Sequence, residues 1–283
     1  MRNRLRKFLI ASSRIIRSEM RIKVHHFFVT ENQVNKENKE IIITGSDVNH
    51  IINVLRMKAG EEVLISDGNG NDYLGRIKDG SDRDKVLVDI TDEKYEGSEL
   101  PSKIYLFQGL PKSDKMEMII QKAVELGVYE IIPVATKRAV VKLDAKKESA
   151  KLKRWNGISE SAAKQSRRSI IPKVNNVMSF KEAINYAKTL DINLIPYENY
   201  KDMSETKEVI ANVKKEMSVG IFIGPEGGFD EAEIDTAVES GINRISLGKR
   251  ILRTETAGLM IVSVLMFKFC LLYTSPSPRD ISG

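Results

Sequence analysis

Two segments in the second half of the chain combine glycines with charged residues where a strand is expected to turn into a helix. In the first, VGIFIGPEGGFDEAEID (residues 219–235), an apolar run leads into three glycines within five residues, and a helix is expected to start at Asp230, with Glu233 completing a capping box. Glycine lets a ligand approach the backbone, and loops after strands line the ligand-binding edge of an α/β sheet. The segment therefore predicts one wall of a small-molecule pocket, although a purely structural turn fits the same residues.

A second segment, RISLGKRILRTETAGLM (residues 244–260), repeats this design. Gly248 follows the expected strand, and Thr254 and Glu255 suit the first helical turn, because threonine is a favoured N-cap and a carboxylate complements the helix dipole. Residues 196–198 (PYE) end another expected strand and are the candidate for a third wall. Neither glycine segment has the spacing of a P-loop or of a dinucleotide fingerprint, so a phosphate cradle is not predicted.

The chain carries a net charge of +6, and the excess of basic residues lies in its middle. Residues 101–173 hold sixteen basic and seven acidic side chains, a local net charge of +9. Such a segment is typical of proteins that bind a nucleic-acid backbone, but lysines on a solvated helix face give the same composition. The candidate nucleic-acid contacts are Lys112, Arg138, Arg167 and Arg168 of this segment, together with Arg56 from the first part of the chain.

The composition argues against several other kinds of site. Cys270 is the only cysteine, so no intramolecular disulfide or cysteine-based metal cluster can form, and a reducing compartment, the cytoplasm, is expected. The three histidines do not assemble a metal-binding set, so no metal is expected. The apolar run from Ala257 to Phe267 is shorter than the roughly 20 residues that span a membrane and is followed by Lys268, so no membrane partner is expected.

The order of strand-like and helix-like runs predicts two domains. Residues 23–98 contain five short runs rich in β-branched and aromatic residues (HHFFV, EIIIT, EVLISD, DYLGRI and KVLVDI), a hairpin turn at residues 67–72 and a short helix at about 47–55. This pattern favours a small β-barrel. Residues 101–268 alternate strands with helices, including a basic helix at about 149–168, which is typical of a mainly parallel α/β sheet.

The two ends of the chain are set apart from these domains. Residues 1–22 form an extension whose first 20 residues hold six basic side chains and one acid. This composition fits an organellar transit peptide or upstream sequence read through before Met20, and we favour the second interpretation. Residues 269–283 are Ser- and Pro-rich, lack periodicity and are expected to be an unstructured, foreign tail.

Longer motifs give a specific resemblance. IGPEGGFDEAEI followed by SLGKRILRTETA resembles the paired signature of the RsmE-type SPOUT methyltransferases. The resemblance covers about residues 23–268, through HIINVLRMKAGEEVLISDGNG, KSDKMEMIIQKAVELGVYEIIPVATKRAVVK, KLKRW and AAKQSRRSIIP. Small departures occur at Lys249, where proline is common, and at Ser161, where an acid is common. The combination of motifs is far more specific than any one of them.

The resemblance implies an α/β fold class in which a SPOUT trefoil-knot methyltransferase domain follows an N-terminal PUA-like β-barrel that helps to bind RNA. It also implies S-adenosyl-L-methionine as cofactor, 16S ribosomal RNA or the small ribosomal subunit as partner, a homodimer, and methylation at N3 of a uridine. Carried onto this chain, the cofactor-binding residues are Tyr197, Glu198, Ile223, Gly224, Pro225, Glu226, Gly227, Gly228, Leu247, Gly248, Ile251, Leu252, Arg253, Thr254 and Thr256.

Methylation at uridine N3 requires a proton acceptor and a cation, because this nitrogen becomes a good nucleophile only when it loses its proton. Glu226 and Glu255 are candidate acceptors, and Arg253 and Arg168 are candidate cations, while each of the glutamates also has a purely structural interpretation. Two other functions remain open: a SPOUT enzyme that acts on another base or on a ribose hydroxyl, and a non-catalytic RNA-binding assembly factor. The intact glycine loops argue against the assembly factor.

The last expected helix predicts an assembly. TAGLMIVSVLMF (residues 256–267) is apolar on nearly every face. A helix without a polar side is covered on most of its circumference, and its own domain can cover only one face. A second subunit related by a two-fold axis is the expected cover for the other.

Overall fold

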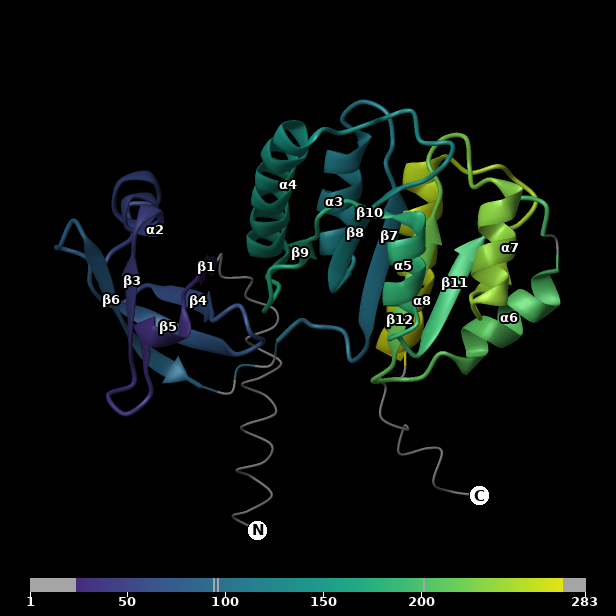
Figure 1. Ribbon diagram of the computed structural model, residues 1–283. Helices are drawn as coiled ribbons and strands as arrows, with labels where there is room; N and C mark the ends of the chain where they lie inside the picture. Colours follow the sequence, from purple (N-terminus) through teal and green to yellow (C-terminus); the bar gives the residue numbers. More distant parts are fainter. Residues whose placement is uncertain (1–23, 94, 96, 201, 272–283) are drawn as a thin grey trace, which may run out of the picture. The chain divides into compact units, whose positions relative to one another are not determined.

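The structure, a computed structural model, describes residues 24–271 except residues 94, 96 and 201. The chain divides after Tyr95 into two compact units, with Gly68–Gly70 belonging to the second (Figure 1). The predicted extension 1–22 and residues 272–283 of the predicted tail lie outside the described residues.

The first unit is built on a six-stranded sheet in the order β1-β4-β5-β6-β3-β2. β1 pairs with β4 in parallel and the other neighbours are antiparallel. In β3, Ile41 and Ile43 are buried while Ile42 is exposed, as expected where side chains alternate between a core and solvent. The elements are β1 (His25–Phe28), η1 (Glu31–Gln33), β2 (Val34–Asn35), β3 (Glu40–Thr44), α2 (Ser46–Asn49), η2 (His50–Val54), β4 (Glu62–Ser66), β5 (Asp72–Asp79) and β6 (Lys85–Asp92).

The predicted strands of the first unit are confirmed, and the structure adds the two-residue strand β2. The helix predicted at about residues 47–55 forms as one α-helical turn, α2, followed by the π-helical turn η2. Val48 and Ile51, one from each turn, are buried in the core beneath the sheet.

The second unit has a seven-stranded sheet in which every neighbouring pair is parallel. Six strands follow the order β10-β8-β7-β12-β11-β13, and β9 pairs with β8 beside this path. In a parallel sheet the carboxyl ends of all strands meet at one edge, so the loops after β7, β11, β12 and β13 lie along the same edge. The strands are β7 (Lys103–Gly109), β8 (Glu130–Ala135), β9 (Lys173–Val174), β10 (Met178–Ser179), β11 (Ile192–Pro196), β12 (Ser218–Ile223) and β13 (Asn243–Ile245).

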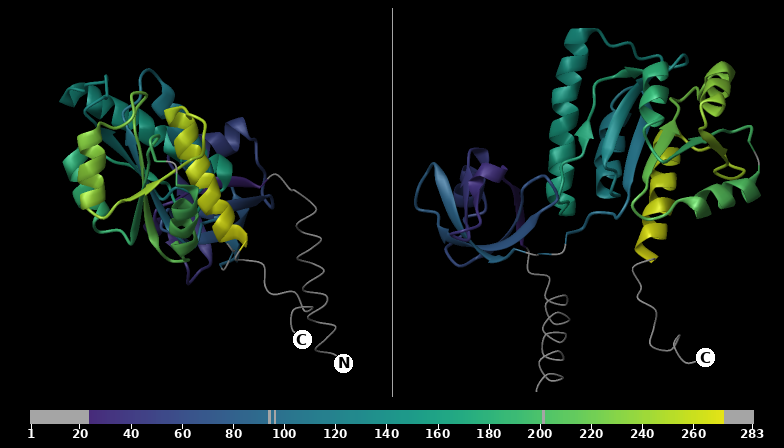
Figure 2. Two further views of the ribbon diagram at one scale, coloured as in Figure 1. Left: turned by 90° about the vertical axis from the view of Figure 1, so that its right-hand side faces the viewer. Right: turned by 60° about the horizontal axis from the view of Figure 1, so that its bottom comes forward.

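Helices cover both faces of this sheet, as Figures 1 and 2 show for α5 and α8. Tyr105 and Phe107 of β7 share a core with residues of α5 and α7 on one face, whereas α3 and α8 pack together on the other. The predicted α/β pattern is confirmed, although the basic helix α4 begins earlier than expected, at Ala145. The helices are α3 (Lys115–Glu125), α4 (Ala145–Ser166), α5 (Phe180–Ala187), α6 (Met203–Asn212), α7 (Glu231–Glu239) and α8 (Thr254–Leu271).

The last helix, α8, has a buried side and an exposed apolar side. Leu265 and Phe269 are fully buried against the domain, while Phe267 is 61% exposed. Because Phe269 belongs to the core, the helix continues to Leu271, and the prediction that the unstructured tail starts at residue 269 was wrong for residues 269–271. None of the helices in the described part of the chain combines the length and apolar character needed to cross a membrane.

An ion pair between the buried Arg168 and the partly exposed Glu99 joins the beginning of the second unit to the end of α4. Arg168 is 3% exposed, and its guanidinium donates to both carboxylate oxygens of Glu99 and to the carbonyl oxygens of Val124 and Val128. The Glu99 carboxylate also accepts from the backbone N–H groups of Ser169 and Ile170. The pair therefore holds residues 99 and 168–170 against α3.

Replacing Arg168 with methionine should lower the free energy of unfolding by about 3 kcal/mol, because removing the buried guanidinium leaves its carboxylate and carbonyl partners without their donor. Urea unfolding followed by the fluorescence of Trp155, the single tryptophan, reports on this unit. The matched control is Arg167→Met, since the Arg167 side chain is exposed. Equal unfolding midpoints for the two variants would contradict this assignment.

Candidate active site at the carboxyl edge of the parallel sheet

A cavity of about 340 Å³ opens at the carboxyl edge of the second sheet. Its walls come from the ends of three neighbouring strands, β11, β12 and β13, and from the first turns of α3 and α8. The lining residues are Lys115, Pro196, Tyr197, Glu198, Ile223, Gly224, Pro225, Glu226, Gly228, Phe229, Ser246, Leu247, Gly248, Arg250, Ile251, Leu252, Arg253, Thr254 and Ala257.

The loop after β12, residues 224–229, closes tightly on itself and on the end of β7. The Gly228 N–H donates to the Pro225 carbonyl at 2.9 Å, and Gly228 has a positive φ of 66°. A Cβ added at Gly224 would lie 2.9 Å from the carbonyl carbon of Gly228, and one added at Gly109 would lie 2.7 Å from the nitrogen of Pro225. Side chains do not tolerate such approaches, so both positions require glycine.

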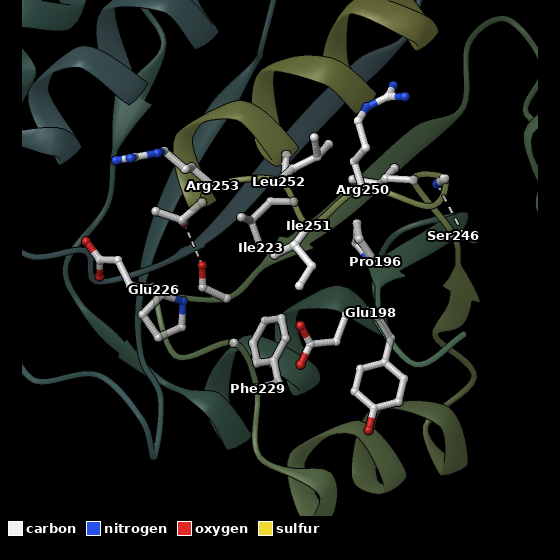
Figure 3. A pocket seen from close by; sticks show the side chains of 18 of the residues that line it. Pro196, Glu198, Ile223, Glu226, Phe229, Ser246, Arg250, Ile251, Leu252 and Arg253 are labelled. Atoms are coloured by element: carbon white, nitrogen blue, oxygen red, sulfur yellow. Dashed lines mark hydrogen bonds between the residues drawn. The ribbon is translucent and has the colours of Figure 1, made fainter. Parts of the chain in front are cut away.

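The segment after β13 is tied to this loop through Thr254, the first residue of α8. The Thr254 hydroxyl donates to the Gly224 carbonyl at 2.6 Å (Figure 3). Gly248, with a positive φ of 98°, turns the chain after β13, and its N–H donates to the Ser246 hydroxyl. Two walls that are distant in sequence are therefore joined directly.

The cavity has an apolar middle and charged edges (Figure 3). Ile223, Phe229 and Ile251 lie around its centre, while the guanidinium groups of Arg250 and Arg253 point away from it. Among the described residues, no ion pair involves either arginine. An apolar cavity with polar groups at its rim is the usual form of a small-molecule site.

Glu226 is held by two donors at one edge of the cavity. Its carboxylate accepts from the Lys112 N–H at 3.1 Å and from Lys115 Nζ at 2.8 Å. Burial by itself raises the pKa of Glu226, but the hydrogen bonds from Lys115 and from backbone N–H groups outweigh this effect, and the net pKa lies below its ordinary value. The ammonium of Lys115 is also 3.8 Å from Glu255.

A second set of contacts docks the loop after β8 on the glycine loop. Arg138 donates to the Gly227 carbonyl at 3.2 Å and pairs with Asp230 at 3.7 Å. Asp230 is the N-cap of α7 and forms the predicted capping box with Glu233. The Glu233 carboxylate also accepts from the Lys137 N–H, so Glu233 contacts both the loop after β8 and the N-terminus of α7.

No group of three or more His, Cys, Asp or Glu side chains in the described part of the chain could hold a metal ion.

Comparison with known proteins identifies the family. A family described as RNA methyltransferase domain matches residues 98–266, and one described as RNA methyltransferase PUA domain matches residues 43–91. The chain is 37% identical to ribosomal RNA small subunit methyltransferase E of Bacillus subtilis, over 87% of this chain and 97% of that protein. The protein of the same name from Mesomycoplasma hyopneumoniae is also 37% identical, over 85% and 98%. The chain belongs to the ribosomal RNA small subunit methyltransferase E family.

A solved structure of the family supports the fold assignment. The Neisseria gonorrhoeae ribosomal RNA small subunit methyltransferase E, crystallised with S-adenosylmethionine, superimposes with a TM-score of 0.74 at 30% identity, over 87% of this chain and 98% of that one. The predicted family and the predicted fold class, an α/β methyltransferase domain of the SPOUT type after a PUA-like domain, are confirmed by this likeness and by the matched families.

The cavity brings together most of the residues predicted to bind the cofactor. Thirteen of the fifteen line it, and the exceptions are Gly227 and Thr256. Gly227 faces Arg138 instead, and Thr256 is exposed on α8. Pro196 lies in the predicted third wall, whereas the sequence did not single out Lys115, Phe229, Ser246, Arg250 or Ala257 individually as pocket residues. Phe229 could have been predicted as a pocket residue, because it directly follows the glycines of the loop after β12.

The predicted RNA contacts are distributed differently. Lys112, Arg138, Arg167 and Arg56 are exposed, and the first two lie beside the glycine loop through the hydrogen bonds described above. Arg168 is buried, and the hydrogen bonds to Glu99 and to two carbonyl groups occupy most of its donors. The predictions that Arg168 contacts RNA and acts as a catalytic cation conflict with this burial, and its position assigns it to the fold.

The lowered pKa of Glu226 gives a pH-dependent prediction. A carboxyl whose pKa is lower in the folded state adds stability above its unfolded pKa, and this stability is lost as the pH falls through the folded value. Glu226→Gln should therefore lower the thermal unfolding midpoint at pH 7. Its difference from the wild type should start to shrink below about pH 4.3, the ordinary glutamate pKa, and should vanish once the carboxyl is protonated in the folded state as well. A difference that stays constant down to pH 3 would contradict the lowered pKa.

Proposed function

We propose that this protein transfers the methyl group of S-adenosyl-L-methionine to N3 of a uridine in the 16S ribosomal RNA of the small subunit. The observation that carries the proposal is the cavity walled by three loops at the carboxyl edge of the sheet, in a chain whose relatives are named as methyltransferases of this RNA. We also propose that the protein works in the cytoplasm, where its single cysteine stays reduced.

The residues of the cavity fit the proposed cofactor. Ile223, Phe229 and Ile251 offer apolar contacts for an adenine ring, and Glu198 offers a carboxylate for hydroxyl groups. At Gly248 an added Cβ would meet nothing within 4 Å, so the backbone there lies open to a ligand. When bound, the cofactor supplies a methyl group on a sulfonium, which is already a good leaving group, so the protein mainly has to position the reactants.

The chain's own residues then have to deal with the N3 proton. Glu226 is occupied by Lys112 and Lys115 and has a lowered pKa, which suits an anchor of the glycine loop better than a proton acceptor. Glu255 is the better acceptor, because its buried Oε2 accepts no hydrogen bond from the described residues and the Lys115 ammonium lies 3.8 Å from it, farther than from Glu226. Arg253, which lines the cavity and forms no ion pair with the described residues, is the proposed cation for the charge that develops on the flanking carbonyl oxygens.

The proposed contacts for the RNA backbone near the reacting base lie around the glycine loop or the cavity and are Lys112, Arg138, Arg250 and Arg253. Arg56 and Arg167, which are exposed, are proposed to contact the RNA elsewhere. Lys112, Arg250 and Arg253 form no ion pair among the described residues, and Arg138 remains 45% exposed beside Asp230. Each cation that contacts a phosphate group makes RNA binding salt-dependent.

Gly224→Ala should abolish both cofactor binding and methylation, since the added Cβ would lie 2.9 Å from the Gly228 carbonyl carbon and distort the loop. The matched control is Gly157→Ala in α4, where an added Cβ meets nothing within 4 Å. Calorimetry measures S-adenosylmethionine binding, and mass spectrometry of 16S ribosomal RNA from a deletion strain measures complementation. The wild type and Gly157→Ala should restore one N3-methyluridine, and Gly224→Ala should not.

Other results of the same experiment identify the alternatives. A methyl group restored on another base or on a ribose would show a different target of the same enzyme. Cofactor binding without any restored methyl group would favour the non-catalytic assembly factor.

We further propose that the protein is a homodimer. Met260, Val264 and Phe267 of α8 are 39%, 39% and 61% exposed and follow one another at helical spacing, so they form an apolar stripe on the outer side of the helix. A second subunit that covers this stripe would remove it from water.

We also propose that the second unit contains a trefoil knot. The proposal is supported by the path of the chain from β13, at one edge of the sheet, back to α8, which packs on the central strands β7 and β12.

Val264→Glu combined with Phe267→Glu should convert the dimer into folded monomers, because both side chains are exposed within one subunit. Light scattering at micromolar concentration should fall from the mass of two chains to that of one. Met203→Glu, an equally exposed apolar position on α6, is the control and should leave the mass unchanged. A wild-type protein with the mass of one chain would refute the dimer.

A further inference from the structure

Gln108 places a carboxamide inside the apolar core of the second unit. It is the penultimate residue of β7, is fully buried, and lies opposite Ile223 in the register with β12. Leu106, two positions earlier and hence on the same face of the strand, is also fully buried. Gln108 does not line the cavity.

The carboxamide is only partly satisfied. Its Nε2 donates to the Thr254 hydroxyl at 2.9 Å and to the Gly109 carbonyl at 3.0 Å. Its Oε1 is buried and accepts no hydrogen bond from the described residues. A buried acceptor without a donor costs folding free energy, whereas an apolar side chain of similar size, such as methionine, would avoid this cost. Stability alone does not account for a glutamine at this position.

The amide does determine which way the Thr254 hydroxyl points. A hydroxyl has one proton to donate, and an Nε2–H of Gln108 directed at its oxygen leaves that proton free for the Gly224 carbonyl, to which it donates at 2.6 Å. Thr254 and Gly224 both line the cavity, one at the start of α8 and the other after β12. The series Gln108, Thr254, Gly224 thus joins the central strand to two cavity walls.

We propose that Gln108 is a positioning residue for the cofactor, which acts through Thr254 on the Gly224 carbonyl without touching the ligand. The proposal rests on the proposed function, since it takes S-adenosylmethionine as the ligand of this cavity. It implies that the chain gives up some stability at residue 108 in exchange for a fixed relation between the two walls, a trade-off found where function and stability compete.

The test compares cofactor affinity with stability in Gln108→Met, which keeps the volume and removes the donor. The dissociation constant of S-adenosylmethionine, measured by calorimetry, should rise about ten-fold, the size expected for one lost hydrogen bond. The thermal unfolding midpoint should stay the same or rise. The matched control is Ser159→Ala in α4, which removes a fully buried hydroxyl that donates to the Pro172 carbonyl. This variant should lower the unfolding midpoint and leave the affinity for the cofactor unchanged.

A double-variant comparison tests the route through Thr254. On a Thr254→Val background, Gln108→Met should weaken binding by little more than Thr254→Val alone, because the hydroxyl through which it acts is gone. An equal, independent loss in both backgrounds would overturn the proposal. A loss of affinity in Gln108→Met together with a fall in the unfolding midpoint would also overturn it, since a merely structural role predicts that combination.

The role of Gln108 and the proposed function can be tested separately. Wild-type protein that binds S-adenosylmethionine while Gln108→Met binds it equally well overturns the role of Gln108 alone. Wild-type protein that does not bind S-adenosylmethionine overturns the proposed function and this inference with it.

Discussion

The cavity depends on how closely the chain after β12 approaches the end of β7. The two strands pair in register up to Ile223 and Gln108, so the next residues, Gly224 and Gly109, must pass each other at the sheet edge. A Cβ at Gly109 would come within 2.7 Å of Pro225, and a Cβ at Gly224 would meet Gly228. Because neither position carries one, the loop turns back sharply over the strand ends. The space left beside β11 and β13 is the cavity.

Charged residues divide into those that hold this arrangement and those that remain available. Lys115 and the Lys112 N–H engage Glu226, and Arg138 engages Asp230 and the Gly227 carbonyl, so both neighbouring loops are tied to the glycine loop from outside. Such ties pre-organise the walls, and a site that is already formed spends less binding energy on ordering itself. Arg250 and Arg253 have no ion pair among the described residues, which is why they are proposed as contacts for a polyanionic partner.

A site residue could be predicted from the sequence where the residues that define its position are close together in the chain. The glycine loops were predictable, because a strand, a run of glycines and a helix N-cap are consecutive residues. Lys115 was missed because it lies 111 residues from Glu226 and reaches it only through the pairing of β7 with β12. Arg168 was wrongly assigned to RNA contact because composition does not distinguish an exposed arginine from a buried one. Arg167 ends α4 in a left-handed conformation, with φ of 59°, and the side chain of Arg168 therefore points inward to Glu99. The fold class came from strand–helix alternation together with the resemblance, and the knot from the resemblance alone.

We propose that the walls of the cavity are already formed before S-adenosylmethionine binds. A crystal structure of the protein with this cofactor tests it most directly. We expect density for the whole cofactor between residues 223–229 and 246–254, with the Gly228 N–H still bonded to the Pro225 carbonyl and the Thr254 hydroxyl to the Gly224 carbonyl. Density at another place on the protein, or a loop that has to open and lose these two bonds to admit the cofactor, would contradict it.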